Sequence, residues 1–252
     1  MATRWENYQR CISPIPESQP VWRLHGKGLE NLGIEGAPEY DPVPQPGRGE
    51  VLARVDAVSV CASDAKMVRL GNEYPLFKDR DLAADPPRLG HELALTVVEA
   101  GSAVSAQFAP GQRLALQPDV MTSQGRTPVG VILSGGFAQY MLLDEQILSR
   151  QYGPFAYPVE GLDYGSVAVS EPWACVERTY RASRRLAPRE GGRMLIRFCR
   201  ALSNSSAMDR QYRLLSDVRP SRIDLVGDVS SQAPLIADLN RSGAIVRTLP
   251  AP

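Results

Sequence analysis

Two apolar runs on either side of a polar loop decide the fold. The first is Val51–Val60, VLARVDAVSV, and the second is His91–Ala100, HELALTVVEA. In the first run, β-branched residues alternate with other residues, which is typical of a strand with one buried face. The second run is also rich in residues that favour strands and is closed by Gly101. The two runs therefore predict a β domain built around a pair of strands.

Shorter runs on both sides of this pair extend the β pattern. Arg113–Gln117 follows a Pro-Gly turn signal, and Gly135–Leu143 opens with two glycines. On the N-terminal side, the four prolines of residues 36–50 exclude a helix and indicate an extended connector. Residues 40–148 thus hold four or five short strands separated by turns. This pattern predicts a small barrel-like β domain.

The pattern changes to alternating helix and strand after residue 160. Apolar residues recur at helical spacing over Ser166–Ala182, where Pro172 either starts a second helix or kinks a single one. Beyond it, the sequence predicts three strands, at Arg193–Phe198, Arg222–Val226 and Ala244–Leu249. Two helices are predicted between them, at Ser206–Asp217 and Ser231–Arg241. This β-α-β-α-β order is that of half a doubly wound sheet. We therefore expect a mixed α/β chain, divided into residues 1–165 and 166–252.

Composition places the chain among ordinary globular proteins. Its 252 residues include 28 basic and 28 acidic side chains, and the formal net charge is zero. This balance gives no support to nucleic acid or an anionic membrane as a partner, because both favour clustered basic residues. No apolar run approaches the roughly 18–20 residues that span a bilayer, and the N-terminus shows no signal peptide. Four widely spaced cysteines argue against a disulfide scaffold, so we expect a cytoplasmic protein.

Three short segments combine residues that can bind a metal ion. They are Cys61-Ala62-Ser63-Asp64, Gly90-His91-Glu92 and Glu171-Pro172. A cysteine, a histidine and a carboxylate form a mixed set of donors that suits Zn²⁺, and catalytic zinc sites use about three protein ligands with one open position. Each residue also has a structural interpretation, with Cys61 and His91 in the core and Glu171 capping a helix. Spacing alone leaves both interpretations open.

Five motifs, which contain these candidate ligands, occur in a characteristic order along the chain. They are CASD at residues 61–64, GHE at 90–92, PGQRLALQP at 110–118, GGFAQYMLL at 135–143 and EPWACVE at 171–177. In this order they resemble the zinc-dependent medium-chain alcohol and polyol dehydrogenases. Two further stretches, LHGKGLENLG at 24–33 and the loop at 71–92, are similar to the sorbitol and L-sorbose-1-phosphate reductases of that family. The resemblance covers residues 20–190.

The resemblance implies a GroES-like β-barrel catalytic domain followed by a truncated Rossmann-like segment. It implies Cys61 and His91 as zinc ligands, with Glu92 and Glu171 in the carboxylate positions, one bound directly and the other through water or in exchange. Glu92 would thereby take part in catalysis. Ser63 would relay the proton of a substrate alcohol, and Asp64 would orient a ligand. The implied substrate is a polyol, sugar or sugar phosphate, the implied cofactors are Zn²⁺ and NAD or NADP, and a homo-oligomer is compatible with the family.

Two departures from the family pattern affect these expectations. Many members hold a second, structural zinc with four closely spaced cysteines, but residues 93–170 contain no cysteine. Members also carry a G-x-G-x-x-G turn that lets the backbone approach a dinucleotide pyrophosphate. Residues 197–211, RFCRALSNSSAMDRQ, contain no glycine. Arg197 and Arg200 are alternative phosphate contacts, and Asp228 is either the acid that binds the adenine ribose or a simple turn residue. Only three strands of a nucleotide sheet are predicted, where a complete domain has about six.

Two functions therefore stay open. The first is an NAD(P)-linked oxidoreductase, which the motif order favours. The second is a family-derived protein that keeps the zinc pocket without nucleotide binding and either dehydrates or epimerises a polyol or serves as a non-catalytic partner. Lys78, Arg80 and Arg88, before His91, either clamp a phosphate ester or pair with the acidic residues of their own loop. We expect the first function, with weak binding of the nucleotide.

Overall fold

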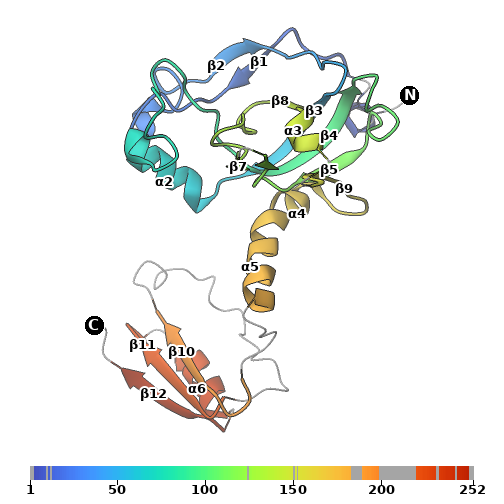
Figure 1. Cartoon of the computed structure of the whole chain (residues 1–252). Coiled ribbons are helices and arrows are strands. Elements are labelled where there is room, and N and C mark those ends of the chain that lie inside the picture. The colour runs from blue at the N-terminus through green and yellow to red at the C-terminus, as the bar shows by residue number, and fades with distance from the viewer. Residues whose placement is uncertain are drawn as a thin grey trace. The chain divides into compact units, whose positions relative to one another are not determined.

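The structure is a computed structural model of the whole chain (Figure 1). It describes every residue except 1–2, 10, 12, 124, 150, 152, 183–188, 199–219, 231–232, 242 and 250–252. The chain divides into two compact units, Met1–Ala174 and Cys175–Pro252, and each is described by itself. The division expected between residues 165 and 166 stays a prediction.

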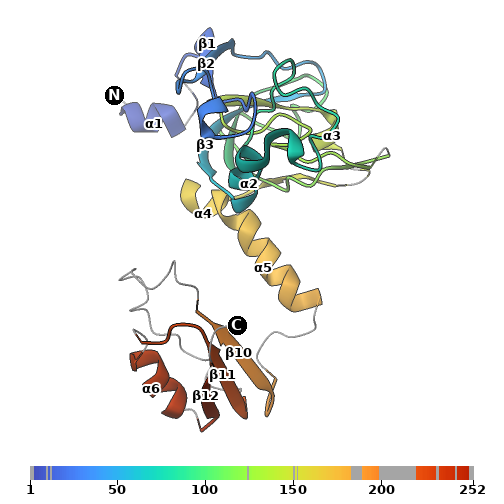
Figure 2. The same cartoon turned by 90° about the vertical axis from the view of Figure 1, so that its left-hand side faces the viewer.

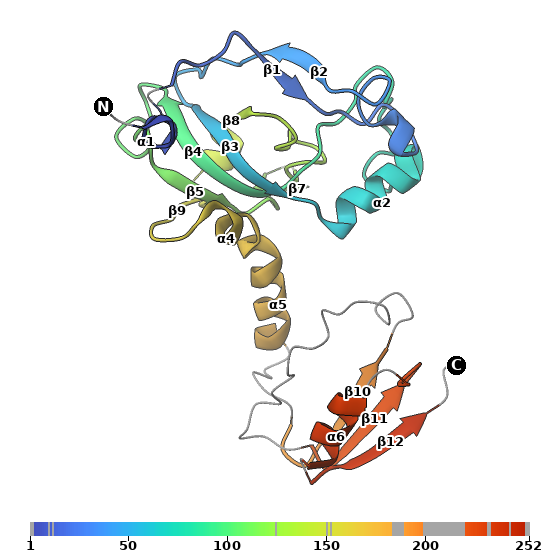
Figure 3. The ribbon, with the colours of Figure 1, turned by 180° about the vertical axis from the view of Figure 1, so that it is seen from behind.

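An antiparallel sheet forms the body of the first unit (Figures 1 and 3). Its strand order is β8-β3-β4-β5-β9, with β3 at Val51–Ser59, β4 at Glu92–Ala100, β5 at Arg113–Leu116, β8 at Tyr140–Leu143 and β9 at Ala156–Pro158. Both predicted strands are confirmed, and the structure shows that β3 and β4 are neighbours over almost their full length. The predicted strand at 135–143 begins only at Tyr140, because the amides of Gly135, Gly136 and Phe137 donate instead to the carbonyls of residues 88–90.

Shorter elements surround this sheet (Figure 2). The helices are α1 at Arg4–Gln9, α2 at Ala62–Leu70, α3 at Glu145–Leu148 and α4 at Tyr164–Ala168, with 3₁₀ turns η1 at Leu29–Asn31 and η2 at Gly71–Glu73. The helix α5, Ser170–Ala182, follows α4 and crosses the boundary between the two units. Two hairpins are added, β1 at Ser18–Val21 with β2 at Glu39–Pro42, and β6 at Met121–Thr122 with β7 at Gly125–Arg126. Pro172 lies in the first turn of α5, where its missing amide proton costs no helical hydrogen bond. Of the two alternatives for Pro172, the structure therefore shows a separate second helix.

The core of the first unit lies on the concave side of the sheet. Every second residue of β4, namely Leu93, Leu95 and Val97, is buried there against β3, β5 and β8. A second apolar cluster contains Met67 of α2 and Phe77 of the loop that follows it. Because successive strand residues point to opposite faces, Glu92, Ala94 and Thr96 face the other side of the sheet.

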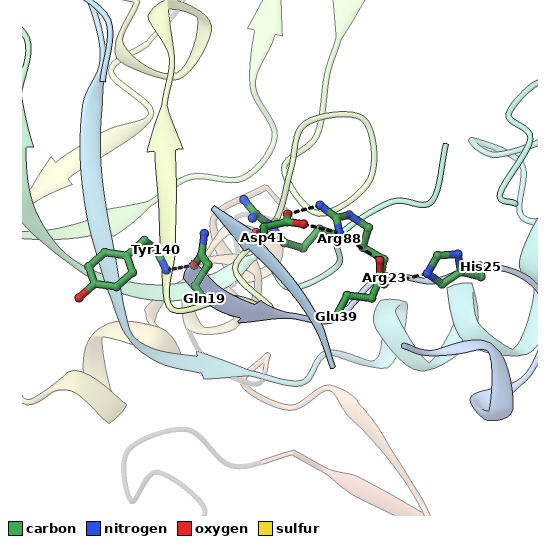
Figure 4. A network of polar contacts seen from close by, with 8 residues as sticks. Gln19, Arg23, His25, Glu39, Asp41, Arg88 and Tyr140 are labelled. Carbon is green, nitrogen blue, oxygen red and sulfur yellow. Dashed lines mark hydrogen bonds and ion pairs between the residues drawn. The ribbon is translucent and has the colours of Figure 1, made fainter. Parts of the chain in front are cut away.

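Charged residues after β1 pair with β2, and Gln19 of β1 accepts a hydrogen bond from the backbone amide of Tyr140 in β8 (Figure 4). The Arg23 guanidinium donates to the carboxylates of Glu39 and Asp41, and His25 Nε2 lies 2.8 Å from Glu39 Oε1. Arg88 lies beside this group, and its Nε donates to the carbonyl of Gly135 at 2.6 Å. Burial, together with the charge of Arg23, lowers the pKa of Arg88 to about 10. The segment just before His91 is thus held between the hairpin and the Gly135 loop.

The second unit is a parallel sheet with a helix packed on it. Its order is β10-β11-β12, with β10 at Arg193–Arg197, β11 at Arg222–Val226 and β12 at Ile245–Leu249, and α6 spans Ala233–Arg241. Leu239 of α6 is buried with Ile223 and Leu225 of β11. These elements confirm the predicted mixed α/β class with a Rossmann-like strand order. The predicted helix at Ser206–Asp217 lies outside the described residues. None of the helices that the structure describes is long and apolar enough to cross a membrane.

Candidate metal centre

Cys61 lies between β3 and α2, where the chain turns from strand to helix. It is the N-cap of α2 and keeps extended backbone angles, with φ −83° and ψ 155°. Its backbone amide donates to Asp64 Oδ2 at 2.9 Å, and the Cys61 side chain accepts from the amide of Asp64. This reciprocal pair is a capping box with a thiol in place of the usual hydroxyl. Sequence reasoning assigned no element to residues 62–70, although an acidic residue three places after Cys61 was the available signal.

His91 and Glu92 come from the start of β4, opposite the end of β3. Glu92 pairs in register with Ser59, two residues before Cys61, so the pairing brings the two segments together. Gly90 has a φ of +89°, and a Cβ at this position would lie 2.5 Å from the ring of Phe137. Glycine is therefore required at this close approach, and its backbone conformation leads the chain into His91.

Three side chains gather at this point. One ligand atom each from Cys61, His91 and Glu92 lies within 4.8 Å of the others. Cys61 and His91 are half-buried and Glu92 is buried, and Ser63 Oγ lies 3.3 Å from His91 Nε2. Glu171, the fourth ligand expected, lies half-buried in the first turn of α5 and is not part of this group among the residues searched. The structure thus brings together three of the four predicted ligands.

The Asp64 carboxylate lies beside the imidazole of His91. Asp64 Oδ1 lies 3.5 Å from His91 Nδ1, which is buried and has no hydrogen-bond partner among the described residues. Burial by itself would lower the pKa of His91, but Asp64 and then Cys61 outweigh burial and raise it to about 9. A positive charge is therefore favoured at this position. A thiol, an oriented imidazole and a buried carboxylate are the donor set that Zn²⁺ takes, so these residues fit a zinc ion.

We expect Asp64→Asn to weaken zinc binding by about tenfold, because neighbours that orient a ligating histidine contribute this much. An asparagine amide also places a donor against the amides of Cys61 and Gly90, which now donate to the carboxylate. Competition with a chromophoric chelator would measure the zinc affinity. Asp79→Asn is the matched control, since Asp79 lies on an exposed loop, and equal zinc affinity in Asp64→Asn and the parent protein would contradict the role of Asp64.

The basic residues before His91 have structural partners. Arg80 donates to the carbonyls of Asp85 and Val131 and pairs with the Asp85 carboxylate. Lys78 lies 3.9 Å from Asp79, with both side chains exposed. Arg88 lies in the network under the hairpin (Figure 4). Lys78 and Arg80 therefore pair with acidic residues of their own loop, which was one of the two alternatives. Their contacts give no support to the other alternative, a clamp for a phosphate ester.

The two nucleotide contacts predicted in the second unit lie at one edge of its sheet. Arg197 ends β10, and Asp228 follows β11, so both lie at the carboxyl ends of parallel strands, where α/β sheets bind ligands. Asp228 accepts hydrogen bonds from the amide and hydroxyl of Ser230, which is the contact of a turn residue. Arg200 and most of the glycine-free stretch lie outside the described residues. Without a glycine-rich turn, the sequence at this edge does not fit a dinucleotide pyrophosphate.

The GroES-like part of the chain is recognisable by sequence. The profile described as alcohol dehydrogenase GroES-like domain matches residues 47–151, a range that contains Cys61, His91 and Glu92. A sorbitol dehydrogenase of Gallus gallus is 37% identical over 82 residues, which are 32% of this chain and 21% of that protein. These matches support the medium-chain alcohol/polyol dehydrogenase family for this chain. The resemblance identified from the five motifs is thereby confirmed.

Two further relatives match over more of the chain. The protein YggP of Escherichia coli K12 is 28% identical over 216 residues, which are 82% of this chain and 48% of YggP. Mannitol-1-phosphate 5-dehydrogenase of Aliivibrio fischeri is 25% identical over 191 residues, which are 72% of this chain and 44% of that enzyme. The chain thus spans about half the length of the curated relatives it matches.

A solved structure shows the same fold. Acetophenone reductase of Geotrichum candidum, in complex with NAD, superimposes with a TM-score of 0.55 at 20% sequence identity. The match covers 93% of this chain and 64% of the reductase. At this identity, the likeness supports the dehydrogenase fold alone.

Proposed function

We propose that this protein is a zinc-dependent oxidoreductase that acts on an alcohol or ketone group of a polyol, a sugar or a sugar phosphate, with NAD or NADP as the hydride carrier. The gathering of Cys61, His91 and Glu92 beside the Ser63 hydroxyl carries the proposal. Family membership supports the oxidoreductase class. The names of the sorbitol and mannitol-1-phosphate relatives support the polyol and sugar phosphate substrates.

In this proposal Cys61, His91 and Glu92 hold the zinc ion, and Glu171 supplies a further carboxylate that binds in exchange with water. Zinc, when bound, lowers the pKa of a coordinated alcohol. Ser63 would relay the proton of that alcohol: its Oγ accepts this proton while its own hydroxyl proton passes to solvent. The Ser63 hydroxyl lies 3.3 Å from His91 Nε2, beside the ligand group. Asp64 keeps the His91 ring in place through Nδ1, which leaves Nε2 facing the ligand group.

The proposed partners are small molecules in the cytoplasm. Arg197 and Asp228 are the proposed contacts for the nucleotide, at the carboxyl edge of the second sheet. Since the residues here do not fit a pyrophosphate, we derive no hydride step from them.

A second candidate function follows from the glycine-free residues 197–211. A zinc pocket without nucleotide binding is suited to dehydration of a polyol, in which a hydroxyl leaves as water, or to its epimerisation at a carbon beside a carbonyl group, where a proton is removed and returned on the other face. Neither reaction needs a hydride carrier. The same pocket without turnover would make the chain a non-catalytic partner.

One assay separates these candidates. The zinc-loaded protein is incubated with sorbitol or mannitol 1-phosphate and either NAD⁺ or NADP⁺, and the absorbance of the reduced nicotinamide is followed. We expect slow, zinc-dependent formation of reduced cofactor that a chelator abolishes. Dehydrated or epimerised polyol, detected by NMR in the absence of nucleotide, would favour the second candidate. No product in either assay would contradict both enzymatic proposals.

A further inference from the structure

The outer face of β4 connects the metal centre with the N-terminal helix. Glu92, Ala94 and Thr96 follow one another on this face. Glu92 belongs to the ligand group, and Ala94 is buried beneath Val167 and Ala168 of α4. The hydroxyl of Thr96 donates to Asp56, the residue that holds α1. The ligand group, α4 and α1 therefore lie in sequence along one strand face.

The helix α1 is held to the sheet by contacts of Tyr8 with a buried ion pair of β3. Arg54 Nε donates to Asp56 Oδ1 at 2.7 Å, and Arg54 is 6% exposed. The Tyr8 hydroxyl donates to the same Asp56 oxygen at 2.8 Å, and the Tyr8 carbonyl accepts from Arg54 Nη1 at 2.6 Å. The Arg54 guanidinium also lies over the Tyr8 ring, 3.5 Å from its centroid. Three kinds of contact thus fix Tyr8 to the outer face.

Aromatic rings continue from Tyr8 to the start of α4. The ring of Trp5 stacks on the ring of Tyr8, with the ring centroids 5.6 Å apart. The Trp5 ring also meets the ring of Tyr164 edge to face, with the centroids 6.2 Å apart. Tyr164 is the first residue of α4, and the guanidinium of Arg113 lies 4.2 Å from its ring centroid. Figures 2 and 3 show α1 and α4 on the same side of the sheet. Trp5 therefore joins the two helices.

The helix α4 leads directly to Glu171. Val169 is the single residue between α4 and α5, and Glu171 is the second residue of α5. The Val169 amide donates to the carbonyl of Gly165, and the Trp173 amide donates to the carbonyl of Val169, so hydrogen bonds run across the junction. A change in the position of α4 is thus passed to Glu171 by the backbone.

We propose that Trp5 and Tyr8 are positioning residues of the metal centre. By holding α4 against the outer face of β4, they keep Glu171 where its carboxylate can act as the exchangeable ligand. The inference rests on the proposed function, because it takes Glu171 as a zinc ligand.

A double-mutant cycle on the full chain tests the inference. We expect Trp5→Ala to weaken zinc binding by about two- to tenfold, the range of an aromatic pair, and Glu171→Gln to weaken it at least as much. The Trp5→Ala/Glu171→Gln double variant should bind zinc as Glu171→Gln does, because residues that act through one another are not additive. Trp5→Phe should restore the affinity. Tyr40→Ala, which alters a 72% exposed tyrosine on β2, is the control and should bind zinc like the parent protein.

The visible absorption bands of the Co²⁺-substituted protein report on the metal ligands. A loss of stability alone does not shift these bands. Trp5→Ala should shift the bands in the same direction as Glu171→Gln, while circular dichroism shows an unchanged fold. Additive effects on zinc affinity, an unshifted spectrum in Trp5→Ala, or full affinity in Glu171→Gln would overturn the inference. Full zinc binding in Cys61→Ser would instead overturn the proposed function. If Cys61→Ser loses zinc but the effects of Trp5→Ala and Glu171→Gln on zinc affinity are additive, only the positioning role is overturned.

Discussion

Cys61→Ser is expected to purify almost free of zinc, whereas the parent protein carries a single zinc ion per chain. The substitution removes the thiolate, one of about three protein donors that a catalytic zinc site needs. Serine is a preferred N-cap residue, so the helix α2 keeps its start and the Asp64 side chain keeps its contact with the backbone. The loss of zinc would therefore report on the ligand and not on the fold. Metal analysis of the gel-filtered protein would measure it.

Cys175→Ser is the matched control, since Cys175 is an exposed cysteine on α5. This variant should retain the zinc content of the parent protein. Zinc should raise the melting temperature of the parent and of Cys175→Ser but leave that of Cys61→Ser unchanged, because a ligand stabilises only the folded state that binds it. Two zinc ions per chain, or an undiminished zinc content in Cys61→Ser, would contradict the assignment.

The dissociation constants of NADH and NADPH are expected to be at least about a hundredfold higher than in relatives with a glycine-rich turn. The sequence of residues 197–211 contains no glycine, the residue that lets backbone amides approach a pyrophosphate in such a turn. Losing two or three charge-assisted hydrogen bonds costs roughly 1.5–3 kcal/mol each, which is enough for a change of this size. Arg197, at the end of β10, recovers part of this loss if it contacts phosphate.

Titration with each nucleotide, followed by the fluorescence of the three tryptophans, would measure these constants. Arg197→Ala should weaken any residual binding further, and Arg189→Ala, an exposed arginine before β10, should not. Micromolar or tighter binding by the parent protein would contradict the prediction and favour the oxidoreductase over the zinc-only alternative.

The parts of the fold that follow local patterns could be predicted from the sequence. Runs of β-branched and apolar residues predicted the strands β3 and β4. The change of apolar period after residue 160 predicted the elements β10, β11, α6 and β12. The metal-binding residue types were also visible, because a cysteine, a histidine and glutamates occur in ordered motifs. These features depend on neighbouring residues, which is why one sequence was enough to find them.

The candidate site itself depends on contacts between distant segments. Cys61 and His91 meet only because β3 and β4 pair with Ser59 opposite Glu92, and no local pattern encodes a strand register. The position of Asp64 against His91 likewise follows from α2, which the sequence analysis did not assign. The sequence alone therefore indicated which residues could bind a metal ion and which segments form strands. The tertiary structure decided which of those residues meet. It also joined the N-terminal helix to the sheet face that carries Glu92, because the hydrogen bonds of Tyr8 with Arg54 and Asp56 form only when distant segments pack together.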